Sequence, residues 1–99
     1  MATSASISIQ GDTLTLSGVL DHESVLDIDQ QGQQWLLESQ TREYKLDLGA
    51  ITYSSSAGIA LLLGWLRIAQ QQQKTLQFLH MPVSMIALAN VGGLEDLLV

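Results

Sequence analysis

The sequence predicts one α/β domain whose elements follow the order β-β-α-β-α-β-α. Three observations support this fold class: period-two alternation of apolar residues near the N-terminus, two longer stretches with helical periodicity, and short apolar strands between them. Strands separated by helices of this length pair in parallel through right-handed crossovers. The 99 residues contain no internal repeat or linker, so we assign residues 1–99 to a single domain.

The first 17 residues predict a β-hairpin. Apolar and polar residues alternate over residues 6–10 and again over residues 13–17, and the Gly-Asp pair between these two strands suits a tight turn. We expect the apolar side chains of both strands to face inward; they are Ile7, Ile9, Leu14 and Leu16.

An amphipathic helix is expected over residues 22–39. Asp21 and Ser24 are both suitable N-caps, and Ser24 with Asp27 resembles a capping box. Gly32 lies within the helix at a cost of ~1 kcal/mol relative to Ala, unless a close packing contact requires the missing side chain. The apolar face expected from the spacing consists of Val25, Ile28, Gly32, Trp35 and Leu36.

A third strand is expected over residues 44–48, followed by a loop over residues 49–54. The almost unbroken apolar run 57–69 predicts a second helix, which the polar residues 70–74 end. At 1.5 Å per residue the run is about 20 Å long. It is therefore too short to cross a hydrocarbon core of roughly 30 Å, and Arg67 interrupts it, so we expect no membrane insertion.

The remaining residues predict a strand and a helix. Residues 75–79 have the pattern of a fourth strand. Pro82 suits a first helical turn and the glycines at 92–93 suit a helix end, so a third helix is expected over residues 83–91. Residues 94–99 are expected to add a short helical turn.

The charge distribution excludes several classes of function. The chain has 10 acidic and 4 basic side chains, and its net charge of −6 belongs entirely to the first 41 residues. Nucleic-acid binding requires clustered Lys and Arg, which this sequence lacks. The absence of cysteine excludes disulfides and Cys-based zinc sites. The first five residues lack the features of a secretory signal, so we expect a cytoplasmic protein.

Histidine and methionine give only weak signals. His22 and His80 have no partner at metal-ligand spacing, so we expect no metal site and no cofactor. His22 is expected to be a solvated neighbour of the helix cap, and His80 a structural residue. Met81 and Met85 are expected to fill the core or an interface.

Three serines, residues 54–56, precede the apolar helix. The start of a helix has unpaired N–H groups and a positive dipole end, which favour an anion, a capping hydroxyl or a phosphoserine. The simplest interpretation is that Ser55 or Ser56 is the N-cap. A nucleophile elbow requires glycine at position 54, and a P-loop requires lysine after Gly58. Neither is present, so we predict no catalytic residues and no enzymatic activity.

Residues 46–62 resemble the signature of STAS domains, in which a D-L-x-x-V strand leads through D-[ST]-[SAG]-G-[LI] into an apolar helix. The resemblance extends to the element order of the whole chain. It implies a mixed four-stranded sheet with the helices packed mainly on one face. The aspartate of the family falls on Ser55, its hydroxyl on Ser56 and its glycine on Gly58. The phosphoacceptor serine of anti-sigma-factor antagonists falls on Ala57, which has no hydroxyl.

Within this family, the apolar helix is similar to that of small STAS subunits of phospholipid-transport ABC systems. The resemblance implies a non-enzymatic subunit that binds the ATPase (nucleotide-binding) subunit through the hydroxyl position of Ser56. It also implies a location peripheral to the inner membrane, contact with lipid only through the assembled transporter, and a role in outer-membrane lipid asymmetry.

The apolar helix itself suggests a partner surface. Residues 59–63 are all apolar, so apolar side chains point to every side of the helix. A helix that packs on a sheet requires an apolar stripe of little more than 100°. Either the neighbouring helices bury the excess or a partner protein covers it. The partner-binding residues expected from the second alternative are Ser55, Ser56, Ala57, Ile59, Leu62, Leu63 and Leu66.

Two other functions remain open from the sequence. An anti-sigma-factor antagonist would be controlled by phosphorylation at Ser55 or Ser56. A small-ligand sensor would hold an anion at the start of the second helix.

Overall fold

The computed structural model describes residues 5–38 and 41–91, which form four strands and three helices. The predicted order β-β-α-β-α-β-α is confirmed. The predicted glycine cap at 92–93 and the short turn at 94–99 lie outside the described residues. The elements are β1 (Ala5–Gln10), β2 (Thr13–Leu20), α1 (Ser24–Glu38), β3 (Glu43–Ser54), α2 (Ser56–Gln71), β4 (Thr75–Leu79) and α3 (Val83–Val91).

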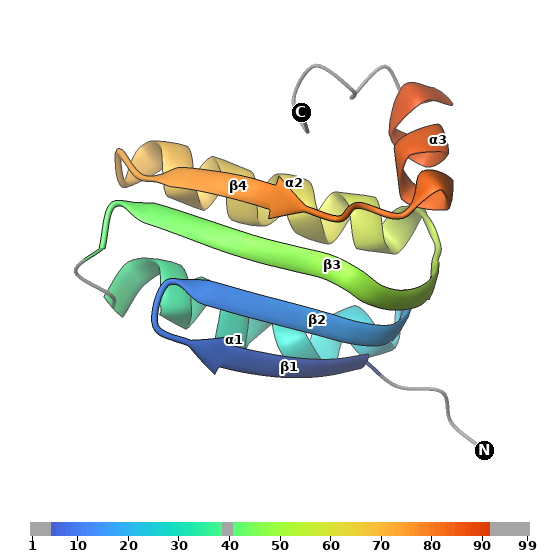
Figure 1. Ribbon diagram of the computed structural model, residues 1–99, viewed down its shortest axis with the longest axis horizontal. Helices are drawn as coiled ribbons and strands as arrows, with labels where there is room; N and C mark the ends of the chain where they lie inside the picture. The colour runs from blue at the N-terminus through green and yellow to red at the C-terminus, as the bar shows by residue number, and fades with distance from the viewer. Residues whose placement is uncertain (1–4, 39–40, 92–99) are drawn as a thin grey trace.

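The described strands form one mixed sheet in the order β1-β2-β3-β4. β1 pairs antiparallel with β2, whereas β2 with β3 and β3 with β4 are parallel. Both parallel connections pass through a helix, and Figure 1 shows α1 and α2 lying together behind the sheet. α3 stands at one end of the molecule, beyond β4. The expected packing of helices on one face is therefore confirmed.

The hairpin is confirmed, with one difference in burial. The register pairs Ile7 with Leu16 and Ile9 with Leu14, so the four side chains share a face. Leu14 and Leu16 are fully buried and Ile7 is half-buried, but Ile9 is 44% exposed. The expectation that Ile9 is buried was wrong, because β1 is an edge strand with no described strand along its outer side.

β3 is longer than the sequence indicates, and the loop predicted over residues 49–54 is wrong. These residues continue the parallel pairing with β2, up to the pair Leu20 and Ser54. The register shifts twice along this part of the ladder. Burial in β3 then recurs at every third residue, at Leu48, Ile51 and Ser54, so the period-two signal of a strand is lost.

α1 begins at Ser24 and is capped by Asp21. The Asp21 carboxylate accepts from the Ser24 N–H at 2.9 Å, and the Ser24 hydroxyl accepts from the Asp21 N–H at 2.9 Å. The capping box therefore joins Asp21 with Ser24, and Asp27 has no part in it. The Ser24 hydroxyl also donates to the Val19 carbonyl at 2.7 Å, which attaches the start of α1 to the end of β2.

Lys74 stabilises the other end of α1. Its ammonium group donates to the Leu36 carbonyl and, at 3.2 Å, to the Tyr44 hydroxyl. The Tyr44 ring is buried and packs edge-on against Trp35, with 4.6 Å between the ring centroids. The residue that follows the polar end of α2 thus caps the last turn of α1.

The closest packing between helices is at Gly32. The predicted apolar face of α1 is confirmed at Ile28, Gly32, Trp35 and Leu36, which are buried, whereas Val25 is half-buried. A Cβ atom at Gly32 would overlap the ring of Trp65 from α2. The indole N–H of Trp65 donates to Asp29 Oδ1 at 2.9 Å, one turn before Gly32. Gly32 is therefore required for α1 and α2 to pack side by side.

The second helix has the predicted apolar character and spans 16 residues. No helix among residues 5–38 and 41–91 is both long and apolar enough to cross a lipid bilayer. Met85 of α3 is fully buried and Met81 packs against the core, which confirms the prediction that they fill apolar space.

Two glycine substitutions test the helix contact. We expect Gly32→Ala to lower the free energy of unfolding by about 1–3 kcal/mol, because the added methyl group overpacks the Trp65 ring. Gly64→Ala is the matched control in α2, where a Cβ has nothing within 4 Å. It should raise the free energy of unfolding by up to ~1 kcal/mol through helix propensity. Urea unfolding measures both, and equal effects at the two positions would contradict the close packing.

Candidate functional site

The serine run joins β3 to α2 and is held by backbone contacts. The N–H of Ser55 donates to the Leu20 carbonyl at the end of β2, at 2.8 Å. The hydroxyl of Ser54 is buried and donates to the carbonyl of Ser55 at 2.9 Å. These bonds fix the loop at the carboxyl ends of two neighbouring parallel strands.

Ser55 is the N-cap of α2, as the simplest interpretation of the sequence holds. Its backbone is extended, with φ −86° and ψ −177°, and its hydroxyl accepts from the N–H of Ala57 at 3.2 Å. Its carbonyl accepts from the N–H of Gly58 at 3.0 Å. Ser55 is half-buried and its hydroxyl is engaged, whereas Ser56 lies exposed on the first turn.

Gly58 allows α2 to begin close to the sheet. A Cβ atom at this position would overlap the hydroxyl of Ser54 and would lie 3.0 Å from the Cβ of Leu20. Any side chain would therefore push the helix start away from β2 and β3. This contact is the physical reason for a glycine at the motif position.

The structure divides the predicted partner-binding residues between the core and the surface. Ile59 is 4% exposed and Leu62 is fully buried, so the expectation that these two side chains reach a partner was wrong. Their side of the helix faces the sheet and joins the core around Trp65. Leu63 and Leu66 are half-buried, as is Ala57.

The outer face of α2 includes two residues that the sequence interpretation missed. Ala60 and Arg67 are both exposed. With the predicted Ser56 and Leu63 they follow the helical spacing i, i+4, i+7, i+11, so they share one face of α2. This spacing can be found in the sequence itself. This outer stripe consists of Ser56, Ala60, Leu63 and Arg67.

Exposed apolar side chains occur near the same end of the molecule. Figure 1 shows α3 standing at the end of the sheet where β3 leads into α2. Val83 and Ile86 of α3 are 82% and 41% exposed, and Tyr53 at the end of β3 is 57% exposed. None of these three residues was predicted as a partner residue from the sequence, and the exposure of Val83 and Ile86 depends on how α3 is placed.

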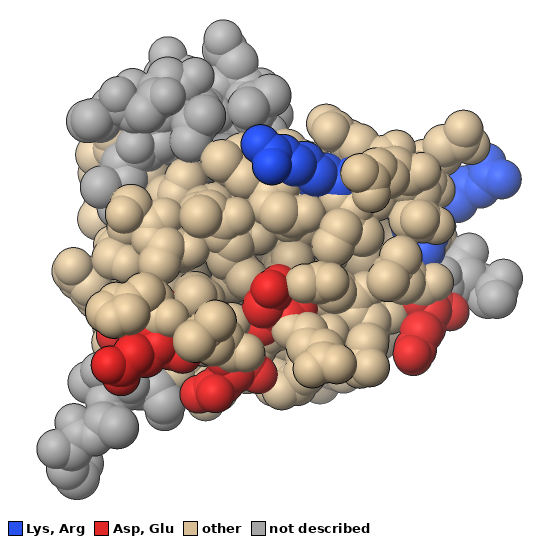
Figure 2. All heavy atoms as spheres, turned by 180° about the vertical axis from the view of Figure 1, so that it is seen from behind, with Lys and Arg blue, Asp and Glu red and all other residues tan. Residues whose placement is uncertain are grey.

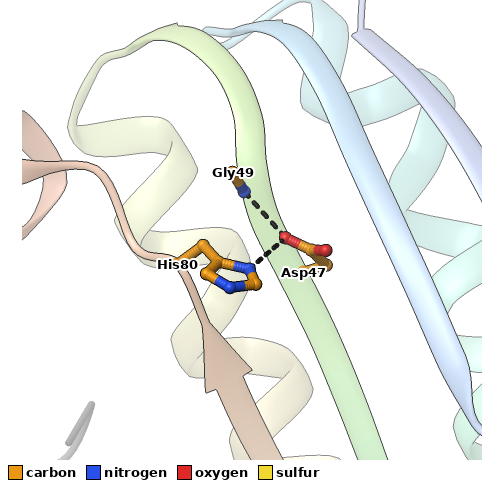
Figure 3. Close-up of polar contacts among 3 residues, drawn as sticks. All are labelled: Asp47, Gly49 and His80. Carbon is orange, nitrogen blue, oxygen red and sulfur yellow. Dashed lines mark hydrogen bonds and ion pairs between the residues drawn. The ribbon is translucent and has the colours of Figure 1, made fainter.

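A histidine–aspartate pair lies on the open face of the sheet (Figure 3). Asp47 alternates with the buried Leu46 and Leu48, so its side chain points away from the core. One carboxylate oxygen of Asp47 lies 3.1 Å from Nδ1 of His80 and accepts from the N–H of Gly49 at 2.9 Å. The hydrogen bond from Gly49, and then that from His80, hold the pKa of Asp47 below its ordinary value of 3.8.

Neither histidine belongs to a metal centre in the described part of the chain. No group of three or more His, Asp and Glu residues there could hold an ion. His80 follows β4 with a φ of +56° and contacts Asp47 on the neighbouring strand. His22 is exposed beside the capping Asp21.

The family of the chain follows from a comparison with family models. A model described as "Mlab, STAS domain" matches residues 4–99. The chain belongs to the MlaB-like STAS family. By the sequence resemblance given above, Gly58 corresponds to the motif glycine of STAS domains and the capping Ser55 to the family aspartate. No protein in the curated set of sequences matches the chain significantly.

Solved structures share the STAS fold. Unphosphorylated SpoIIAA, an anti-sigma factor antagonist, superposes with a TM-score of 0.75 at 16% identity, covering 96% of this chain and 85% of that chain. Phosphorylated SpoIIAA from Bacillus superposes with a TM-score of 0.71 at 17% identity, and the match covers 96% of this chain and 88% of that chain. An anti-sigma-factor antagonist (STAS) domain protein from Planctomyces limnophilus superposes with a TM-score of 0.72 at 14% identity, and the match covers 99% of this chain and 88% of that chain. At these identities the similarity shows the fold alone.

The hydrogen bonds of Asp47 predict a contribution to acid stability. Because its pKa is lower in the folded chain than in the unfolded one, Asp47 stabilises the fold above its unfolded pKa, and this contribution is lost as the pH falls below about 4. Asp47→Asn should therefore flatten the decline of unfolding free energy in acid, measured by urea unfolding at a series of pH values. His80→Gln should keep the larger part of this acid-dependent stabilisation, because the hydrogen bond from the Gly49 N–H to Asp47 remains. Parallel profiles for wild type and Asp47→Asn would contradict the assignment.

Proposed function

We propose that this STAS domain is a non-enzymatic subunit that binds the ATPase subunit of a phospholipid-transport ABC complex. The observation that carries the proposal is the outer stripe of α2, which begins at the exposed Ser56 and continues over Ala60 and Leu63. Membership of the MlaB-like family supports the choice of partner.

The chemistry of the stripe suits a protein contact. Protein interfaces combine an apolar, weakly charged centre with a polar rim. Ser56 and Arg67 lie at the two ends of the stripe, and the residues between them are small or apolar. Val83 and Ile86 are exposed apolar residues of α3, which stands at the end of the molecule where α2 begins.

The start of α2 is also preorganised for binding. Ser55 caps the helix, its N–H is bonded to Leu20, and Gly58 packs on Ser54. A partner that contacts Ser56 would therefore order little additional chain, which lowers the entropic cost of association.

The role that we propose is regulatory. The domain stabilises or activates the ATPase subunit on the cytoplasmic side of the inner membrane, and supports outer-membrane lipid asymmetry through the transporter. It contacts lipid only through the assembled complex. The hydroxyl of Ser55 is committed to the helix cap, which favours a binding role over serine chemistry.

One observation favours a second candidate, an anti-sigma-factor antagonist. Ser56 is exposed on the first turn of α2, where a phosphate would be favoured by the helix dipole. Incubation with ATP and an anti-sigma kinase, followed by intact mass measurement, separates the two functions. The ATPase role predicts no phosphate adduct, and an adduct that Ser56→Ala abolishes would favour the antagonist.

The ATPase proposal predicts a specific loss of binding. Ser56→Arg should weaken binding to the purified ATPase subunit by roughly tenfold or more, because a bulky charged side chain replaces a small hydroxyl at the start of the stripe. The arginine disfavours the helix start by only about 0.3–1 kcal/mol, so the fold should persist. The measurement is isothermal titration, with circular dichroism as the check on folding.

The matched control is Ser8→Arg, which places the same charge on an exposed residue of β1. It should bind like the wild type. If Ser56→Arg also bound like the wild type while remaining folded, α2 would not be the contact surface.

A further inference from the structure

The outer edge of β1 is open in the described part of the chain, where β2 is the only strand beside it. Antiparallel pairing directs the N–H and C=O groups of alternate residues toward the partner strand, and those of the residues between them away from it. Gln10 and Thr13 pair directly across the tight turn, so they form a hydrogen-bonded pair. It follows that Ile7 and Ile9 direct their N–H and C=O groups to the open edge.

β1 lacks the features that usually keep an edge strand from pairing. Natural edges are commonly guarded by Lys, by Pro, by a bulge or by a covering segment. β1 is six residues long and contains neither Lys nor Pro, and its register with β2 runs without a shift. Residues 1–11 contain no charged side chain at all. The edge is therefore suited to pairing with an added strand.

A groove of about 430 Å³ lies beside the same strand. The residues that line it come from β1 and α1; they are Ile9, Gln31, Gln34, Trp35 and Glu38. The indole N–H of Trp35 donates to the Gly11 carbonyl at 3.1 Å, which holds α1 against the hairpin. Because successive side chains of a strand point to opposite faces of the sheet, a strand added to β1 would place every second side chain over this groove.

The α1 side of the groove is acidic. Glu38 lines it, and Asp27 lies on the same helix face, at the spacing i, i+4, i+7, i+11 with Gln31 and Gln34. Both carboxylates are exposed, and residues 1–41 contain no Lys or Arg. Figure 2, which views the molecule from the helix side, shows carboxylates along the lower part, where Figure 1 places β1 and α1, and Lys and Arg above them.

This charge distribution selects the occupant of the edge. A second copy paired through β1 would bring two acidic α1 helices side by side, which like charges oppose. An extended segment with Lys or Arg side chains matches the open backbone groups and the acidic helix together. We propose that the edge of β1 binds an extended segment of a partner protein by strand addition. Apolar and basic side chains of the segment lie over the groove, and small polar ones lie beside Ser6 and Ser8.

This edge is separate from the ATPase surface proposed above. Neither β1 nor the groove beside it includes a residue of α2. Ser56→Arg should therefore bind the segment like the wild type, and the two proposals can fail independently.

Two synthetic heptapeptides test the occupant. In each, threonine alternates with larger residues, which are lysine, valine and lysine in one peptide and glutamate, valine and glutamate in the other. Titrated into the isotope-labelled full chain, the lysine peptide should shift the NMR signals of Ile7, Ile9 and Gln34, with an affinity that falls as salt rises. At saturation it should slow hydrogen exchange of the Ile7 and Ile9 N–H groups at least roughly tenfold. The glutamate peptide should bind at least roughly tenfold more weakly.

Backbone methylation separates strand addition from simple charge attraction. Alternate residues of an added strand direct their N–H groups to the neighbouring strand, and the others direct theirs away. Two further lysine peptides carry N-methyl groups either on the threonines or on the larger residues. One of them should bind at least roughly tenfold more weakly, because its methyl groups lie between the paired strands. The other should bind like the parent peptide.

Matched variants test the site on the chain. Ile9→Lys places a like charge at the groove and should weaken binding of the lysine peptide by roughly tenfold, whereas Gln34→Glu should tighten it by about threefold. Ser8→Lys is the control, because it adds the same charge to an exposed residue of β1 on the open face. It should bind close to the wild type, and circular dichroism checks that both lysine variants fold.

Several results would overturn the proposal. They are equal binding of the glutamate peptide, equal effects of the two methylation patterns, unchanged exchange at Ile7 and Ile9, or equal binding to folded Ile9→Lys and Ser8→Lys. Self-association of the wild type that Ile9→Lys abolishes would also overturn it, by assigning the edge to a second copy.

Discussion

The contact of Trp65 with Gly32 and Asp29 determines how the two long helices lie on the sheet. The ring fits only where α1 has no side chain, and its N–H finds a carboxylate one turn away. A buried indole N–H without a partner would be costly, so steric fit and hydrogen bonding select the same arrangement. This contact turns Leu62 and Ala69 of α2 into the core and leaves Ser56, Leu63 and Arg67 outside.

The residues at the start of α2 also fix how this helix lies on the sheet. Gly58 lets the helix begin against Ser54 and Leu20, and Ser55 both caps it and bonds to β2. The position of Ser56 is therefore defined by the sheet. The exposed hydroxyl of Ser56 therefore has a fixed position at the start of the outer stripe, which we propose as a protein contact.

The sequence predicts the element order and the helix at 83–91, because both depend on local periodicity. It leaves open whether Gly32 serves a close packing contact, and the structure shows that it does. The sequence does not predict which side of a helix that is apolar all round faces inward, since Trp65 decides this through a contact with distant residues. Ile59 and Leu62 were assigned to the surface for that reason. The last part of β3 was predicted as a loop because register shifts remove the alternation of buried and exposed residues. The exposure of Ile9 was not predicted because burial at a sheet edge depends on which elements lie next to it.

The absence of cysteine in the chain permits a direct test of whether the outer stripe of α2 contacts the ATPase subunit, as we propose. Single variants Ser56→Cys, Leu63→Cys and, on the open sheet, Ser8→Cys can be labelled with a maleimide, with and without the purified ATPase subunit. If the outer stripe is the contact surface, the subunit slows labelling at positions 56 and 63 and leaves position 8 unchanged. Protection at position 8, with free labelling at position 56, would contradict it.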